Sequence, residues 1–166
     1  EPTTYFGGTE VYFGFTASTG GSVNEHSVQL VSLTGTLVNK APVAQPDKVL
    51  VPGQADTTVT VDVLKNDTDA DPGDKDALHV TAVYDENGST KYEFHNPGDT
   101  VTLASGTRVT LENNGKLSVA MAKGSNDQEV FYYEVTDDKG GISKTAVHLQ
   151  RDSDGDGVAN VDDIDD

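Results

Sequence analysis

Aspartates at alternate positions near the end of the chain are the residues with the most definite chemistry. In a calcium loop, carboxylates at positions one, three and five converge on one ion. A glycine at position six permits the sharp turn, and a backbone carbonyl at position seven adds a ligand. Residues 152–163 follow this spacing and carry an asparagine at position nine and an aspartate at position twelve. They predict a calcium site formed by Asp152, Asp154, Asp156, Val158, Asn160 and Asp163.

This C-terminal stretch differs from an EF-hand in two ways. An EF-hand has a bidentate glutamate at position twelve and flanking helices, whereas the shorter Asp163 stands here and no helical pattern precedes the loop. A solvated acidic tail is the alternative interpretation, because so polar a segment cannot fold by burying apolar surface.

A second group of acidic residues occupies a loop between two expected strands. It contains Asp67, Asp69 and Asp71 at alternate positions, followed by Asp74 and Asp76. The alternating carboxylates can surround one hard cation, and they repel one another unless water or a cation screens them. On spacing alone, a calcium site and an exposed turn both stay open.

The overall charge narrows the classes of partner. The 166 residues include 28 acidic and 11 basic side chains, for a formal net charge of −17. Such a surface repels nucleic-acid phosphates and anionic lipid headgroups, so we expect neither nucleic-acid binding nor membrane insertion. The absence of cysteine excludes disulfides and thiolate metal sites, which leaves calcium as the candidate cofactor and non-covalent staple.

Residues suited to catalysis do not gather in any known pattern. The four histidines are scattered without metal-ligand spacing, and neither a phosphate-binding loop nor a nucleophile elbow occurs. Aspartates on acidic loops rarely provide the concave, partly apolar site that separates the pKa values of an acid–base pair. We therefore expect a protein that is not an enzyme.

Short runs rich in valine, threonine and tyrosine must position these loops. Residues 47–150 contain seven to nine such runs, separated by turn signals at 87–88, 113–115 and 140–141. This spacing predicts an all-β fold with an immunoglobulin-type β-sandwich. Two earlier runs, at 10–17 and 26–38, predict an N-terminal β-hairpin, and the proline-containing stretch 39–46 predicts a connector. We therefore expect three parts: residues 1–38, 39–150 and 151–166.

Several of these segments resemble known families. The central part is similar to bacterial cadherin-like repeats in its lead-in at 39–44, its acidic loop at 63–71, its turn at 114–117 and its closing segment at 131–141. The resemblance implies a β-sandwich with calcium at the module ends, bound by Asp67, Asp69, Asp71 and Asp137. The insertion of Pro72 and Gly73 departs from the usual spacing, which leaves Asp74 and Asp76 open as ligands.

The two flanks resemble other families. Residues 5–33 are similar to the last two strands of a legume-type lectin domain, although that family's sugar-binding and metal-binding residues lie upstream of the segment present here. Residues 152–163 are similar to a thrombospondin type 3 repeat, whose backbone wraps around calcium.

Together these features predict a calcium-binding structural or adhesive module of an extracellular bacterial adhesin, in which calcium rigidifies loops and linkers. Glycans and neighbouring adhesin repeats are the expected partners. One alternative is a carbohydrate-binding module, with aromatic side chains stacked on sugars. Another is a fibre subunit that associates with itself by strand addition.

Overall fold

The chain divides into two units, Glu1–Val38 and Asn39–Asp166. The computed structural model describes residues 38–53, 57–71, 73–122 and 127–163. The predicted N-terminal hairpin and the lectin-like segment therefore lie outside the described residues, except for Val38. The account below concerns the second unit.

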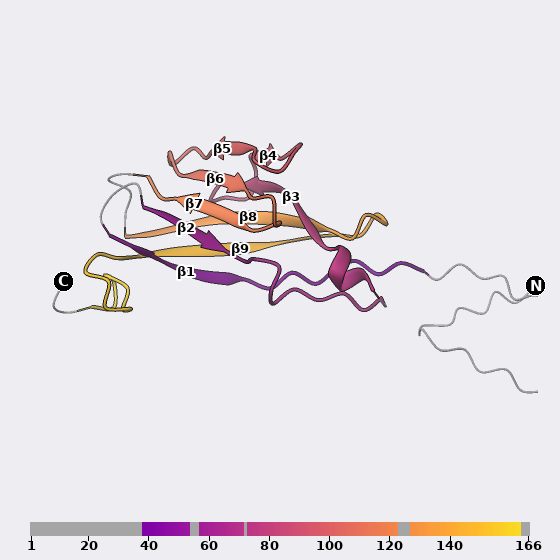
Figure 1. Ribbon diagram of the computed structural model, residues 1–166, viewed down its shortest axis with the longest axis horizontal. Coiled ribbons are helices and arrows are strands. Elements are labelled where there is room, and N and C mark those ends of the chain that lie inside the picture. The colour runs from indigo at the N-terminus through magenta and orange to yellow at the C-terminus, as the bar shows by residue number, and fades with distance from the viewer. Residues whose placement is uncertain (1–37, 54–56, 72, 123–126, 164–166) are drawn as a thin grey trace, which may run out of the picture. The chain divides into compact units, whose positions relative to one another are not determined.

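Nine strands and one short helix form the described part of this unit (Figure 1). The elements are β1 (Asp47–Pro52), β2 (Thr58–Val61), η1 (Asp74–Ala77), β3 (His79–Tyr84), β4 (Lys91–Glu93), β5 (Thr100–Thr102), β6 (Arg108–Leu111), β7 (Leu117–Ala120), β8 (Gln128–Thr136) and β9 (Ile142–Asp152). A five-stranded sheet has the order β1-β9-β8-β3-β4, and a four-stranded sheet has the order β2-β7-β6-β5. The predicted all-β, immunoglobulin-like sandwich is confirmed.

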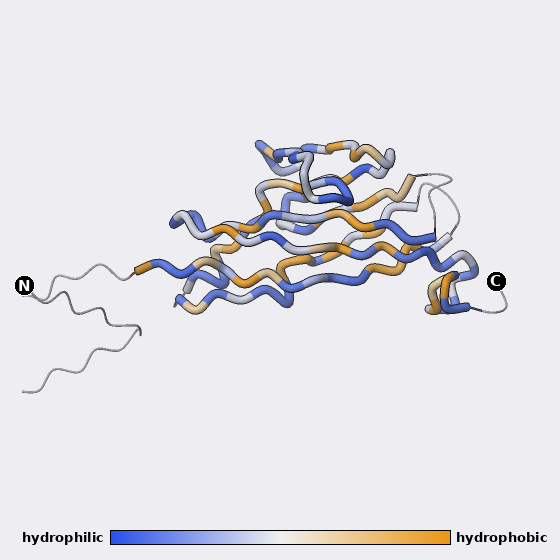
Figure 2. The backbone as a smooth tube through the Cα atoms, turned by 180° about the vertical axis from the view of Figure 1, so that it is seen from behind, coloured by the Kyte–Doolittle hydropathy of each residue, from blue (hydrophilic) through white to orange (hydrophobic). Residues whose placement is uncertain are grey.

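The core lies between the two sheets. Polar and apolar residues alternate along several strands (Figure 2), which places most of their apolar side chains on one face. Phe131 and Tyr133 from β8 are fully buried, as are Val109 and Val119 from the second sheet. Burial of such a side chain stabilises the fold by about 1.5–3 kcal/mol, so these residues fix which faces of the strands point inward.

The first and last strands set the direction in which the chain crosses the module. β1 pairs with β9 in parallel, from Asp47 opposite Val147 to Pro52 opposite Asp152. The chain therefore enters β1 at one end of the sandwich and leaves β9 at the other (Figure 1). We call the segment 39–46, which leads into β1, the entry segment.

The nine strands of the described residues agree with the seven to nine runs expected between residues 47 and 150. The last of them, β9, continues beyond residue 150 to Asp152. The helix η1 has four residues, and among the described residues no helix is long and apolar enough to span a membrane.

Candidate metal centres

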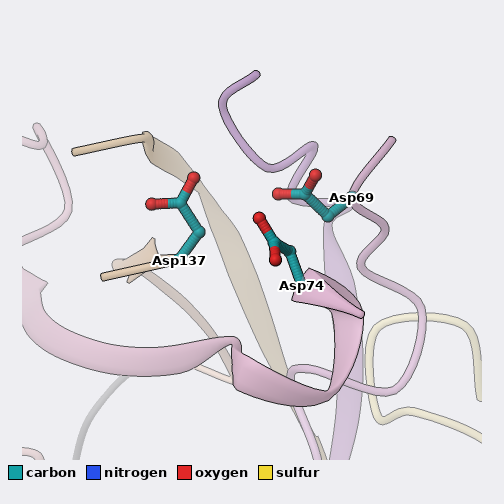
Figure 3. Close-up of side chains that lie close together, drawn as sticks. All are labelled: Asp69, Asp74 and Asp137. Carbon is teal, nitrogen blue, oxygen red and sulfur yellow. The ribbon is translucent and has the colours of Figure 1, made fainter. Parts of the chain in front are cut away.

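Three carboxylates, two from the connection between β2 and β3 and one from the turn after β8, meet at the end of the sandwich where the chain enters. Asp69 lies in the loop after β2, Asp74 begins η1, and Asp137 follows β8. Each offers an oxygen within 4.8 Å of the oxygens from the other two, and Figure 3 shows Asp69 and Asp74 next to each other with Asp137 across from them. We call these residues the entry cluster.

Asp74 is the buried one of the two acids, Asp74 and Asp76, whose role as metal ligands the sequence did not decide. Gly73 has a φ of 87°, a left-handed conformation that glycine adopts at little cost, and the short helix begins directly after it. The Asp74 residue is only 3% exposed. Its Oδ1 atom contacts the Lys139 ammonium, whereas its Oδ2 atom is buried without a hydrogen-bond partner among the described residues.

Backbone groups and the entry segment hold Asp137 in place. Its Oδ1 atom accepts hydrogen bonds from the backbone N–H groups of Lys139 at 2.8 Å and Gly141 at 2.9 Å. Its Oδ2 atom accepts a hydrogen bond from the Asn39 side-chain amide at 2.6 Å. These bonds, with that from Asn39 the strongest, lower the pKa of Asp137, so the carboxylate is charged at neutral pH.

The close approach of the entry segment to Asp137 requires glycine at position 141. A Cβ atom on Gly141 would overlap Asp137 Oδ2 and would lie 2.8 Å from the Cα atom of Ala41. Real contacts of this kind are not found at such distances, so any larger residue would displace the carboxylate or the entry segment.

Two further oxygens beside the entry cluster lack partners. Asp69 Oδ1 accepts a hydrogen bond from the backbone of Asp71 at 2.8 Å, but Asp69 Oδ2 is buried with no partner among the described residues, as is Asn39 Oδ1. Buried polar atoms are normally satisfied. Unpartnered carboxylate and amide oxygens at one place are the donor set that hard cations such as Ca²⁺ prefer.

The entry segment is bonded to the same loops along its length. The backbone N–H of Lys40 donates to Asp71 Oδ2 at 2.7 Å. Val43 and Thr68 exchange two backbone hydrogen bonds, at 2.8 and 3.1 Å. Asp71, which the sequence predicted as a metal ligand, thus binds the entry segment and is not one of the three acids in the entry cluster.

Asp67, another predicted ligand, points instead into a buried polar site. The Tyr133 hydroxyl lies 2.9 and 3.0 Å from its two carboxylate oxygens, and the backbone N–H of Gln45 donates to Oδ1 at 2.8 Å. Burial raises the pKa of Asp67. It also raises the pKa of nearby Asp47 to about 6, with a contribution from the Asp67 charge. Both acids therefore belong to the polar site at the start of β1.

The second candidate centre, at the exit end, is the C-terminal loop (residues 152–163). Asp152, Asp154 and Asp156 again offer oxygens within 4.8 Å of one another. Asp152, the last residue of β9, is 4% exposed, and its Oδ1 and Oδ2 atoms accept hydrogen bonds from the N–H groups of Gly155 at 2.8 Å and Gly157 at 3.0 Å. The loop therefore curls around the Asp152 side chain, as the spacing predicted.

The remaining predicted ligands of the C-terminal loop, Val158, Asn160 and Asp163, are not among its three converging carboxylates. Asn160 Oδ1 accepts a hydrogen bond from the backbone of Ser153 at 2.8 Å and so closes the loop. The Val158 side chain is exposed. The Asp163 backbone N–H donates to the Ala159 carbonyl at 3.0 Å, and Asp163 is not one of the three converging acids in the described part of this loop.

The aromatic residues considered for sugar stacking divide between the core and the sheet surface. Tyr133 is in the core, and Tyr92 and Phe94 pack partly against it. Tyr84 and Tyr132 are paired neighbours on β3 and β8, and the Lys144 ammonium lies over both rings, 4.3 and 5.8 Å from their centroids. One face of the Tyr84 ring is thus already occupied by a side chain of the same domain.

Sequence reasoning missed Asp74 and Asn39 as members of the entry-end site. The departure from the expected loop spacing had left Asp74 undecided, and Asn39 was noted only as part of a lead-in motif. The local signal for Asp74 is its place directly after the Pro72-Gly73 pair, whereas its burial appears only in the folded structure. No local signal identifies Asn39, which reaches Asp137 across 98 positions of sequence.

Comparison with known families identifies the class of the central module. Residues 39–150 match the family described as Bacterial Ig domain, and the chain belongs to this family. A comparison with curated proteins found no match.

Proposed function

We propose that this chain contributes a calcium-stiffened structural or adhesive module to an extracellular bacterial surface protein. The module itself performs no catalysis. Its role is to hold neighbouring segments at a fixed separation and orientation, and calcium makes the segment that enters the module rigid.

The entry cluster is the observation that carries this proposal. Two of its acids come from the connection between β2 and β3 and the third from the turn after β8. Two of its oxygens are buried and unpartnered, and Asn39 of the entry segment supplies a third unpartnered oxygen beside them. Calcium takes six to eight oxygen ligands at about 2.3–2.6 Å. An ion bound there, with water completing its shell, would tie the entry segment to η1 and to the turn after β8.

The path of the chain supports a spacer role. Because β1 and β9 run in parallel, the segments before and after the module leave from opposite ends. The eleven residues of β9 extend over roughly 35 Å, so each such module would lengthen a surface protein by about that distance. The entry cluster and the C-terminal loop lie at these two ends, where an ion restricts bending most effectively.

Membership in the Bacterial Ig domain family supports a structural rather than an enzymatic role. The hollow near Asp85, Ser105 and Glu129 does not contradict this, because its Ser105 hydroxyl already donates to Glu129, which also accepts a hydrogen bond from Thr107. An extracellular location also supplies the millimolar calcium at which modules of this kind are filled.

The test is a calcium titration by calorimetry, combined with thermal unfolding in calcium and in chelator. Binding at one hundred times the Kd stabilises a protein by about 2.7 kcal/mol, which raises the Tm of a domain this size by roughly 10 °C. We expect such a rise for the wild type and its loss in Asp74→Asn.

Asp76→Asn is the matched control, because Asp76 lies in the same short helix but is exposed. It should keep both the heat of binding and the Tm rise. No heat and no Tm shift in the wild type would refute the calcium proposal.

A further inference from the structure

Lys139 places a positive charge directly on the entry cluster. It lies in the turn between β8 and β9, and its ammonium contacts Asp74 Oδ1. Its own backbone N–H donates to Asp137 Oδ1 at 2.8 Å. The residue therefore starts at one acid of the entry cluster and reaches back to another.

The two partners of this ion pair differ greatly in exposure. The Lys139 side chain is 55% exposed, whereas that of Asp74 is 4% exposed. A lysine stem is long and flexible, and its ammonium is readily hydrated. The Lys139 ammonium can thus rotate out into solvent without any movement of the backbone, whereas the buried Asp74 carboxylate cannot leave the site.

The neighbouring acids keep the ammonium charged. The hydrogen bond to Asp74 raises the pKa of Lys139, and the charges of Asp74, Asp71 and Asp137 raise it further. A second lysine near the entry cluster, Lys75 of η1, donates instead to the backbone carbonyls of Leu64 and Asp67. Of these two lysines, Lys139 is the one that pairs with an acid of the entry cluster.

We infer that Lys139 is a tethered counter-ion that takes the place of the metal in the calcium-free protein and must leave Asp74 when calcium binds. The inference rests on the proposed calcium site. A divalent ion bound at Asp74 would lie within a few ångströms of the ammonium, and like charges at that distance in a partly buried site repel strongly. Exchange of one cation for the other removes this repulsion.

Such an exchange has two consequences. The ammonium neutralises part of the repulsion within the entry cluster, so the module folds without calcium. Calcium must also displace the ammonium, so the affinity is lower than the same oxygens would otherwise provide, and the site fills only where calcium is abundant.

The experiment compares the wild type with Lys139→Met, which removes the charge and keeps an unbranched apolar stem. Calcium affinity is measured by calorimetry, and Tm is measured in chelator and in calcium. We expect Lys139→Met to have a lower Tm in chelator, a calcium Kd at least about tenfold smaller, and a larger Tm rise on adding calcium.

Two further variants isolate the cause. Lys116→Met removes an equal charge from an exposed ion pair with Asp62 and should change the Kd less than about twofold, because exposed charges are screened. Lys139→Arg keeps the charge and should restore the Tm in chelator. If Lys139→Met is too unstable in chelator for analysis while Lys139→Arg is folded, the counter-ion role is supported.

The outcomes distinguish this inference from the proposed function. If the wild type binds calcium but Lys139→Met binds it equally or more weakly, the counter-ion inference is wrong and the calcium site stands. If only Lys139→Met binds calcium, Lys139 is a counter-ion that calcium cannot displace, and the proposed function fails for the natural chain. Absence of binding in both proteins overturns both.

Discussion

The entry cluster and the C-terminal loop offer similar groups of three aspartates, but they are built in opposite ways. The entry cluster joins the connection between β2 and β3 to the turn after β8, its ion pair spans 65 positions of sequence, and two of its acids are deeply buried. The C-terminal loop takes its three acids from five consecutive residues, and only Asp152 is buried.

This difference determines what a bound cation can do at each end. An ion that requires a tertiary arrangement binds only the folded state, so its binding energy adds to the stability of the whole module. An ion held by consecutive residues orders mainly the loop that holds it. We therefore expect the entry cluster to control the stability of the module and the C-terminal loop to control local order.

The largest expected effect tests the tertiary character of the entry cluster. Gly141→Ala forces a Cβ atom against Asp137 and the backbone of Ala41, so we expect it to destabilise the module by about 3 kcal/mol and to abolish calcium binding there. Denaturant unfolding with and without calcium measures both effects.

Gly157→Ala provides the contrast in the C-terminal loop. Gly157 has a φ of 94° with open space around its Cα, so alanine should cost only about 1 kcal/mol of backbone strain. Equal costs for the two substitutions would contradict the distinction between the two ends.

Tyr133→Phe should have the next largest effect. Its hydroxyl is within hydrogen-bond distance of both Asp67 oxygens and of the Val63 carbonyl at 3.0 Å. Its removal leaves buried acceptors with fewer donors, at a cost of about 2 kcal/mol. Tyr92→Phe, on the half-buried strand β4, is the control and should change the free energy of unfolding by less than about 0.5 kcal/mol.

Asp47 should make the entry end pH-sensitive. Its folded pKa is about 6, against an ordinary value of 3.8. Its contribution to stability is therefore fully present below pH 3.8 and is lost as pH rises through about 6. Because the site is partly screened by solvent, we expect Asp47→Asn to stabilise the module by about 1 kcal/mol at pH 7.5.

The same substitution should have almost no effect near pH 3.8, where the natural carboxyl is largely protonated in the folded state. Urea unfolding in chelator at both pH values provides the measurement. If the Asp47→Asn variant were less stable than the wild type at the higher pH, that result would contradict the cost assigned to the buried charge.

Asp154→Asn should have the smallest effect on stability. Asp154 is an exposed acid of the C-terminal loop, so we expect the loss of one bound calcium with a Tm change below roughly 2 °C. Calorimetric stoichiometry and thermal unfolding are compared with those of Asp74→Asn. A Tm loss as large as that of Asp74→Asn would show that the exit end also controls the fold.

The strands and the C-terminal loop could be predicted because each is determined by residues close together in the sequence. Alternation of apolar residues decides which face of β8 is buried, and turn residues decide where a strand ends. In the same way, Asp152, Asp154 and Asp156 meet through the curl of a few residues, and the glycines between them allow it.

The entry cluster was predictable only in part, since Asp69 and Asp137 were expected but their partners were not. The sequence by itself determined an acidic β-sandwich and a local loop of three converging aspartates. Only the tertiary structure decided that Asp74 and Asn39 join the entry cluster, that Lys139 pairs with it, and that Asp67 bonds to Tyr133. The physical reason is that strand pairing and the path of the entry segment bring these residues together, and no spacing within one segment encodes a contact across 65 or 98 positions.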